Sequence, residues 1–369
     1  MADQVLLRLR DESFVCSIQS NLIMGCSSLA GLYTSLGDDV AEGTVRAAIE
    51  SGFLQFDTAP HYGCGLAEKR LGTAIHQVCS SEKISELKLW SKVGRLMIDK
   101  DKLDASLSPA FGRSVDHDNV PGSINCIFPD AIRGVVPVLD YTGDGISRSY
   151  IESLKRTGLL ELHGLRIHDC ESPSDIATVL APISFGGGLV QLVKMRADGV
   201  IHDVSIGLND AGAALAILRA APEGSLDSIM IAGSWNLLDH SELCLELLKE
   251  CQMRNIVVHN AGIFASGLLV GGLTYRYSSA PESQINRVML WKNLCDEFGI
   301  PLPAVAMKFA LLPSVIKAAA VGFKNPAEVY QTVEWSKSSV PQSLFVEAKR
   351  RGLIASHVPI MYDVVNNLY

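Results

Sequence analysis

The chain has 369 residues, of which 48% are hydrophobic and 20% are charged, and its formal net charge is -8. This length can form one large α/β barrel or two smaller domains, and the hydrophobic content is enough to bury a sizeable core. The negative balance leaves no basic surplus to neutralise phosphates, so it argues against a nucleic-acid partner, and it gives no support for binding to an anionic membrane surface.

The first residues and the cysteines bear on location. The opening MADQVLLRLRDESF mixes charged with apolar residues and lacks the apolar run of a secretory signal. No stretch reaches about 18 uninterrupted apolar residues, so no membrane-spanning helix is expected. The nine cysteines are scattered without a CxxC pair, as is typical of reduced thiols. We therefore expect a cytoplasmic protein; the choice between a monomer and a homodimer stays open.

Eight short apolar runs, each bounded by polar or glycine-rich turns, recur along the chain. Continuous apolar runs are typical of buried parallel strands, whereas half-exposed strands alternate. The expected strands are 22–28, 53–59, 88–94, 162–169, 203–209, 228–235, 255–262 and 316–323. Helical patterns lie between them at 42–51, 66–78, 145–158, 210–221, 239–252, 285–299 and 325–336. Several of these open with Asp or Asn, which cap free helical N–H groups.

Strands that alternate with helices in this way predict an α/β fold, a (β/α)8 TIM barrel. A doubly wound sheet is the rival, but it rarely needs eight such regular units. No low-complexity linker divides the chain, so we expect a single domain over 1–369. Two segments interrupt the rhythm: a long connection at 95–143, after the third strand, and a tail from about Lys337 to Tyr369. Such long segments are usually functional or disordered, and both can cover the barrel mouth.

Chemically useful side chains fall where the predicted strands end, which is where TIM barrels carry their active sites. Asp57 ends the second strand and Tyr62 lies in the loop after it, while Lys92 lies on the third strand and His168 on the fourth. An ammonium favours the phenolate form of a nearby tyrosine, and a carboxylate can hold that ammonium in place. An imidazole can orient a substrate oxygen. The set can exchange a proton with an alcohol or carbonyl while hydride moves elsewhere.

Each of these side chains also has an ordinary structural explanation. Asp57 alone can cap the turn that follows it, and Lys92 alone can be a solvated or paired lysine. His168 alone is more often a hydrogen-bonded core histidine, and Tyr62 alone is usually a packing residue. Because all four fall at or just after the ends of consecutive predicted strands, a joint functional role is the better interpretation.

Metal chemistry is a competing hypothesis, because Asp57, His61, His168 and Asp169 are suitable ligands. No HxH pair stands at a strand end, and no third histidine falls at another one, whereas a catalytic zinc site needs three protein ligands. We therefore predict no metal. Glycoside hydrolysis by paired carboxylates is weaker still, since only Asp57 and Asp169 qualify.

Two glycine-containing runs are candidate phosphate sites. VGFKNPAEVYQTV (321–333) combines a strand end, a glycine turn and a helix start, and Lys324 adds charge. NAGIFASGLLVGG (260–272), after the seventh strand, has glycines that allow close approach of the backbone. Phosphate sites of TIM barrels often follow strands seven and eight, although ordinary turns would explain either run. No GxGxxG follows the first strand, so a Rossmann site is unsupported.

With these motifs the sequence resembles an aldo-keto reductase over nearly the whole chain. The most specific part is GFLQFDTAPHYGCGLAEKRLG (52–72), which resembles the family signature; SKVGR supplies the family lysine and LRIHD the family histidine. The resemblance implies that Asp57, Tyr62, Lys92 and His168 form the catalytic tetrad. It also implies a nicotinamide cofactor, NAD or NADP, bound extended across the barrel mouth.

Within the superfamily the chain looks most like the D-threo-aldose 1-dehydrogenases, on segments such as AGSWNLLDH, FASGLL and PQSLFVEAKRRGLI. That group includes L-fucose and D-arabinose dehydrogenases and the similar pyridoxal 4-dehydrogenases, and L-galactose dehydrogenases look more distant. The resemblance implies an oxidoreductase that oxidises C1 of a cyclic aldose to the lactone. Two alternatives stay open: a reductase of aldehydes such as pyridoxal, and a non-enzymatic cofactor-binding subunit that senses redox state through Cys64.

The same resemblance implies where the cofactor lies. Its pyrophosphate is expected near Ser266 and Gly267, and its adenosine end near Gly322, Lys324 and Asn325. The remaining cofactor contacts are expected where the chain departs from the family pattern.

Many members place a glutamine on the sixth strand against the nicotinamide amide, but Ala232 stands there, so Asn209 is the best candidate for that amide. No tyrosine stands at the stacking position, which leaves Phe264 or Trp235 to pack on the ring. NADP-preferring members often carry an arginine where this chain has Glu328. A carboxylate there would repel a 2′-phosphate, so we expect NAD.

Overall fold

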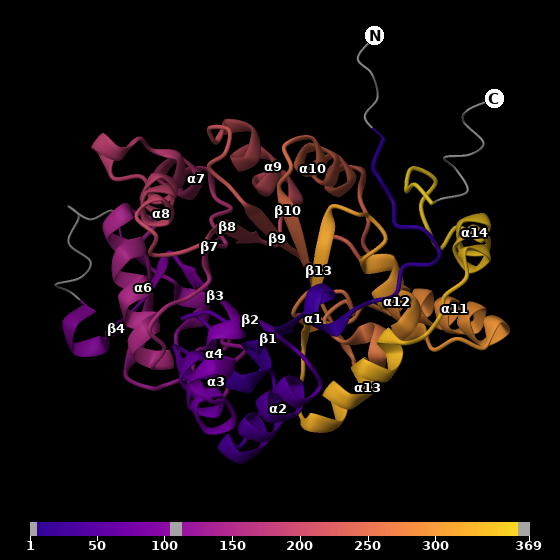
Figure 1. Cartoon of the computed structure of the whole chain (residues 1–369), viewed down its shortest axis with the longest axis horizontal. Coiled ribbons are helices and arrows are strands. Elements are labelled where there is room, and N and C mark those ends of the chain that lie inside the picture. The colour runs from indigo at the N-terminus through magenta and orange to yellow at the C-terminus, as the bar shows by residue number, and fades with distance from the viewer. Residues whose placement is uncertain (1–5, 104–112, 361–369) are drawn as a thin grey trace, which may run out of the picture.

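Eight parallel strands close into a barrel in a computed structural model that describes residues 6–103 and 113–360 (Figure 1). The strands are β1 (Leu22–Gly25), β2 (Gln55–Asp57), β3 (Lys88–Val93), β7 (Gly164–His168), β8 (Asp203–Leu208), β9 (Ser228–Ala232), β10 (Val257–Ala261) and β13 (Ile316–Gly322). Neighbours in the barrel follow chain order, and β13 closes it by pairing with β1, with Leu22 opposite Ala319. The predicted TIM barrel and its eight strands are confirmed.

Helices surround the barrel (Figure 1). They are α2 (Asp38–Glu50), α3 (Leu66–Val78), α6 (Gly143–Thr157), α7 (Pro173–Leu180), α8 (Gly188–Ala197), α9 (Ala211–Ala220), α10 (Glu242–Met253), α11 (Glu282–Phe298), α12 (Leu302–Ala310) and α13 (Pro326–Ser336), with short helices α1 (Ile18–Asn21) and α4 (Ser81–Glu86). The sequence missed α7, α8 and α12. Nearly all residues of α12 are apolar and buried, and a short apolar run of this kind does not distinguish a buried helix from a buried strand.

Side-chain caps fix several helix starts. Asp210 accepts a hydrogen bond from the Ala213 N–H at 2.7 Å, which begins α9 as expected. The predicted helix at 239–252 starts later than expected, because its N-cap is Ser241. Asp239 instead accepts a hydrogen bond from the Tyr275 hydroxyl. The local chemistry of the caps therefore agrees with the predicted helices within a few residues.

The segment 95–143 contains regular structure rather than one irregular connection. Strands β4 (Arg95–Asp99), β5 (Ser114–Val115) and β6 (Val135–Leu139) form an antiparallel sheet in the order β4-β6-β5. Leu96, Ile98 and Val138 form its own small buried cluster. Phe128, between β5 and β6, has its ring 5.9 Å from that of Tyr62, so this insertion reaches the barrel mouth as expected.

The tail after α13 runs first along the outside of the helical ring. Helix α14 (Gln342–Arg350) lies beside α11 (Figure 1), and the next residue, Arg351, pairs with Glu297 of α11 at 2.6 Å. The chain then returns to the loop after β9, where the Ala355 N–H donates to His240 Nε2 at 3.2 Å. Residues 361–369 lie outside the described part, so a tail over the mouth stays a prediction.

Two residues of the signature segment hold α3 in place. The fully buried carboxylate of Glu68 accepts hydrogen bonds from Ser91 on β3 and from Arg156 on α6. Gly72 lets the two helices approach closely, because a Cβ at this position would lie 2.0 Å from the Thr157 carbonyl oxygen. The signature is thus partly a packing motif that positions the loop before α3.

Gly72→Ala is therefore expected to destabilise the protein by about 2 kcal/mol, since overpacked sites cost roughly 1–3 kcal/mol. Gly43→Ala is the matched control, because its Cβ would meet only Pro326 Cγ at 3.5 Å and alanine favours the helix. Urea unfolding followed by circular dichroism measures both. Equal midpoints for Gly72→Ala and Gly43→Ala would contradict this account.

Candidate active site

The ends of β2 and β3 bring an acid, a lysine and a tyrosine into one hydrogen-bonded group. The Lys92 ammonium donates to the Asp57 carboxylate, to the Thr58 carbonyl at 3.0 Å and to the Tyr62 hydroxyl at 2.9 Å. An ammonium has three protons, so these contacts fix its orientation. The Tyr62 loop can turn this sharply because Gly63, Cys64 and Gly65 all adopt left-handed backbone conformations.

Burial and charge act on Tyr62 and Lys92 in opposite directions. Burial lowers the pKa of Lys92, but Asp57 and Tyr62 together raise that pKa above its ordinary value, so the ammonium stays charged. Burial raises the pKa of Tyr62, and the Lys92 ammonium acts against this rise. The sequence predicted that Lys92 would lower the pKa of Tyr62; in the structure burial outweighs that effect.

His168, at the end of β7, completes the predicted tetrad. Its ring meets the Tyr62 ring edge-on, with the ring centres 6.0 Å apart, and its Nε2 lies 3.5 Å from Asp169 Oδ2. Burial, with Arg95 and Lys92 nearby, lowers the pKa of His168 well below its ordinary value. The imidazole is therefore neutral at physiological pH and has one N–H to donate.

Two arginines near the tetrad were missed by the sequence analysis. Arg95 donates to Asp116 at 2.7 Å and to Asp169 at 3.1 Å, and so links the insertion to the end of β7. Arg166 is fully buried inside the barrel and donates to Asp57 at 2.8 Å. Side chains alternate between the two faces of a strand, so Arg166, two residues before His168, lies on the same face as His168. This spacing could have identified Arg166 from the sequence.

Aromatic rings wall the tetrad on one side. The His61 ring lies 5.7 Å from the His168 ring and 5.5 Å from the Phe128 ring. Burial, followed by the charge of Arg95, lowers the pKa of His61 well below its ordinary value. His61 thus adds a neutral surface next to the reacting groups. Its buried Nδ1 has no hydrogen-bond partner among the described residues.

The model of the aldo/keto reductase family matches residues 21–345, which is most of the chain. This protein belongs to the aldo/keto reductase family.

Curated relatives agree with the predicted resemblance. The chain is 31% identical to a pyridoxal 4-dehydrogenase from Microbacterium luteolum, over 90% of this chain and 94% of the relative. It is also 31% identical to a D-threo-aldose 1-dehydrogenase from Pseudomonas sp, over 89% and 93%. An aldo-keto reductase structure from Bacillus halodurans shares the fold, with a TM-score of 0.65 at 18% identity over 96% of this chain and 98% of that one.

Aldo/keto reductases use NAD(P)H, so the mouth should offer groups that suit a nicotinamide nucleotide. After β10, Ala265, Ser266 and Gly267 are all left-handed, and a Cβ at Gly267 would meet nothing within 4 Å. The Ser266 N–H has no acceptor among the described residues. This open, donor-bearing loop fits a pyrophosphate.

Asn209, the candidate for the nicotinamide amide, lies at the end of β8. Its Nδ2 donates to Asp169 at 3.1 Å, and its Oδ1 accepts from the Tyr277 hydroxyl at 3.4 Å. Tyr277 stands in the turn between β11 (Thr274–Tyr275) and β12 (Ser278–Ser279), and its N–H donates to Ser266 Oγ at 3.4 Å. The turn thus joins the two expected cofactor contacts.

The two aromatic candidates for stacking lie in different surroundings. Trp235 is only 1% exposed and stacks on Phe309 of α12, with the ring centres 5.5 Å apart. One face of its ring is therefore covered by Phe309, and a contact with a nicotinamide stays a prediction. Phe264 is half-buried and meets Trp335 of α13 edge-on. Its role stays a prediction.

The expected adenosine contacts surround the start of α13. Gly322 ends β13, and Asn325 caps the helix by accepting from the Glu328 N–H at 3.1 Å. The Glu328 carboxylate in turn accepts from the Lys324 N–H at 2.8 Å. This reciprocal capping holds the Glu328 charge at the helix start, close to the exposed Lys324.

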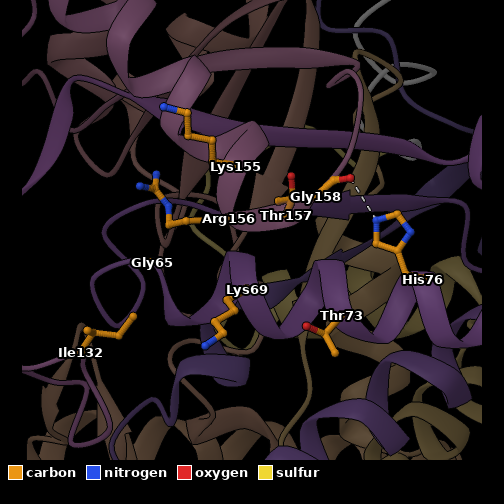
Figure 2. A pocket seen from close by; sticks show the side chains of 9 residues that line it. All are labelled: Gly65, Lys69, Thr73, His76, Ile132, Lys155, Arg156, Thr157 and Gly158. Atoms are coloured by element: carbon orange, nitrogen blue, oxygen red, sulfur yellow. Dashed lines mark hydrogen bonds between the residues drawn. The ribbon is translucent and has the colours of Figure 1, made fainter.

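Figure 2 shows a cavity of about 450 Å³ on the outside of the barrel, between α3 and α6. It is lined by Gly65, Lys69, Thr73, His76, Ile132, Lys155, Arg156, Thr157 and Gly158. His76 closes one end through a 3.1 Å contact from Nε2 to the Gly158 carbonyl. None of the tetrad residues lines it, and Lys69 and Lys155 are exposed, so this cavity is separate from the group at the strand ends.

The described ranges contain neither a cluster of metal ligands nor a membrane-spanning helix. Over 6–103 and 113–360, no three His, Cys, Asp or Glu side chains gather as metal ligands would. Asp57, the first of the suspected ligands, is already engaged by Lys92 and Arg166. Over the same ranges, no helix combines the length and apolarity needed to cross a membrane.

Proposed function

We propose that this aldo/keto reductase oxidises C1 of a cyclic aldose, of the L-fucose, D-arabinose or L-galactose type, to the lactone, with NAD as the cofactor. One observation carries the proposal: the Lys92 ammonium joins the Asp57 carboxylate to the Tyr62 hydroxyl, beside a neutral His168. A carboxylate, an ammonium and a phenol in this order form a proton-transfer group aimed at the mouth.

Each residue of the tetrad has its own role in the proposed proton transfer. Tyr62, in its ionised form, takes the proton of the C1 hydroxyl, and Lys92 stabilises that ionised form. His168 donates its N–H to the same substrate oxygen and orients it. Asp57 keeps Lys92 charged and in place. When bound at the mouth, a nicotinamide would supply the hydride acceptor for the oxidation of C1. Asn209 and the loop 265–267 would hold that group.

The surroundings of Tyr62 suit a sugar. Asp169 and Arg95 offer an acceptor and donors beside the tetrad, while His61 and Phe128 present ring surfaces. Sugar hydroxyls need polar partners, and the C–H face of the ring packs on aromatic surfaces. The D-threo-aldose 1-dehydrogenase at 31% identity supports the same choice.

A second candidate is oxidation or reduction of an aromatic alcohol or aldehyde such as pyridoxal. The pyridoxal 4-dehydrogenase matched at the same 31% identity favours it. The redox-sensing alternative has less support, because burial raises the pKa of the Cys64 thiol to about 12 and keeps it in its unreactive form.

The choice of NAD rests on Glu328. Its carboxylate is held at the start of α13, where the resemblance places the adenosine end, and it would repel a 2′-phosphate. Lys324 would attract that phosphate, but its side chain is exposed, so water and salt screen the attraction between the ammonium and the phosphate.

Absorbance at 340 nm tests the proposal. The purified protein is mixed with NAD or NADP and with L-fucose, D-arabinose, L-galactose, pyridoxal or pyridoxine, and pyridoxal reduction is followed with each reduced nucleotide. The expected result is the highest kcat/KM for one of the aldoses with NAD. Preference for pyridoxine or pyridoxal establishes the second candidate, and cofactor binding without any turnover would reject an enzymatic role on these substrates.

A further inference from the structure

Arg166 is an unusual residue for the inside of a TIM barrel. That interior is ordinarily filled by branched apolar side chains, whereas Arg166 is fully buried there, below His168 on β7. Removing a guanidinium from water costs several kcal/mol unless it is paired and hydrogen-bonded. The contacts of Arg166 must therefore explain why a charge is kept at this depth.

Only one of those contacts is charged. Arg166 Nε donates to Asp57 Oδ2 at 2.8 Å, and the remaining guanidinium nitrogens contact Ser205 Oγ at 2.6 Å, Ser228 Oγ at 3.2 Å and His259 Nδ1 at 2.7 Å. Burial, followed by the Arg166 charge itself, lowers the pKa of His259 well below its ordinary value, so that ring is a neutral acceptor. Among the described residues, Asp57 is the single carboxylate that pairs with Arg166.

Asp57 consequently lies between two cations. Its Oδ1 accepts from Lys92 and its Oδ2 from Arg166. The two cationic side chains run next to each other past Gly207 of β8, where a Cβ would lie 3.6 Å from Lys92 Cε and 3.7 Å from Arg166 Cδ. The buried group therefore carries two positive charges and one negative charge.

This charge balance has a consequence for Tyr62. With Tyr62 protonated, the buried group has an excess positive charge; with Tyr62 ionised, the four side chains sum to zero. Without Arg166, the same ionisation would create an excess negative charge next to Asp57. Burial favours the neutral sum.

We propose that Arg166 is a positioning residue that acts through Asp57: by sharing that carboxylate with Lys92, it offsets the carboxylate's negative field and favours the ionised form of Tyr62. This inference rests on the proposed role of Tyr62 as the proton-transfer group. It goes beyond the tetrad, because it adds a fifth residue, a buried cation, to the proton-transfer machinery.

The other groups that face Tyr62 stay unchanged when Arg166 is replaced. They are His61 on its own loop, His168 and Asp169 from β7, Tyr277 from the β11–β12 turn and, through the two histidines, Arg95 from β4. A change in the titration of Tyr62 in such a variant therefore reports the Arg166–Asp57 pair.

The test measures the ionisation of Tyr62 directly, without a substrate. The chain has nine tyrosines, so the tyrosinate absorbance of each protein is titrated against that of its Tyr62→Phe counterpart, and the difference isolates Tyr62. Arg166→Met is expected to raise the midpoint by about one pH unit or more. Arg166→Lys keeps the charge and is expected to stay closer to the unchanged protein. Arg219→Met, an exposed arginine on α9, is the control and should not move the midpoint.

A double variant separates electrostatics from packing. Adding Asp57→Asn to Arg166→Met removes the carboxylate whose field Arg166 offsets, so the midpoint should fall back below that of Arg166→Met alone. An unchanged midpoint in Arg166→Met, or no recovery in the double variant, overturns the proposal. If Arg166→Met does not fold, Arg166→Gln, which keeps hydrogen-bond donors but removes the charge, is titrated in its place, alone and together with Asp57→Asn, under the same criteria.

The pH dependence of kcat gives a second readout with whichever substrate proves active. In the oxidation direction the rate rises as Tyr62 ionises, so Arg166→Met should move the rising limb upward by the same amount as the titration. A shifted tyrosinate midpoint in a protein that oxidises no aldose would retain the Arg166 proposal and reject the proposed function. The two conclusions can thus fail separately.

Discussion

Tyr62→Phe is expected to lower kcat for aldose oxidation by about 10³-fold, because a positioned proton-transfer group contributes roughly 10²–10⁴-fold. The substitution removes one oxygen and keeps the ring that packs against Phe128 and His168. Lys92 keeps its contacts with Asp57 and the Thr58 carbonyl, so the mouth should keep its shape. Steady-state kinetics measures kcat, and quenching of protein fluorescence measures the dissociation constant of NADH.

The expected pattern is a large loss in kcat with a nearly unchanged dissociation constant for NADH. Tyr150→Phe on α6 is the matched control, because it removes a hydroxyl from the outer helical layer and should leave both quantities unaffected. Turnover within threefold of the unchanged protein would reject Tyr62 as the proton-transfer group. Loss of NADH binding together with turnover would instead point to a damaged mouth.

Much of this site was accessible from the sequence, for a simple geometric reason. In a closed parallel barrel the carboxyl ends of all strands meet on one face, so chemistry-bearing residues at strand ends converge even when they are far apart in the chain. Asp57, Lys92 and His168 needed only correct strand boundaries to be placed together. Tyr62 followed because its loop is short and starts at Asp57.

The residues that were missed or misplaced depend on side-chain direction. The predicted sixth strand ran to Trp235, but β9 ends at Ala232 and the chain then turns, which directs the tryptophan against α12. Tyr277 reaches Asn209 from a hairpin 68 residues further along the chain, and no local pattern announces that contact. Arg166 belongs to the LRIHD motif, but its role depends on the position of Asp57 between two cations, which the sequence does not show.

Lys92→Met is expected to be the second most damaging substitution, with a loss in kcat of about 10²–10³-fold at neutral pH, because it impairs general acid–base catalysis by Tyr62. The ammonium opposes the effect of burial on the pKa of Tyr62, whereas the Asp57 carboxylate adds to it. Without Lys92 the pKa of Tyr62 should therefore rise further, and less of the ionised form would be present. Below the new pKa, kcat should increase about tenfold per pH unit.

The ion pair between Asp57 and Arg166 should keep the Lys92 variant folded, so that a loss of activity can be assigned to the missing ammonium. Removing one partner of a buried ion pair ordinarily leaves an uncompensated charge and costs about 3–5 kcal/mol. Here Asp57 keeps its 2.8 Å contact with Arg166, so Lys92→Met should still fold, which thermal unfolding checks. Lys88→Met at the exposed start of β3 is the control for kcat. A variant of Lys92 that folds and shows the pH profile of the unchanged protein would mean that the ammonium does not act on Tyr62, and the proposed order of proton transfer would then be wrong.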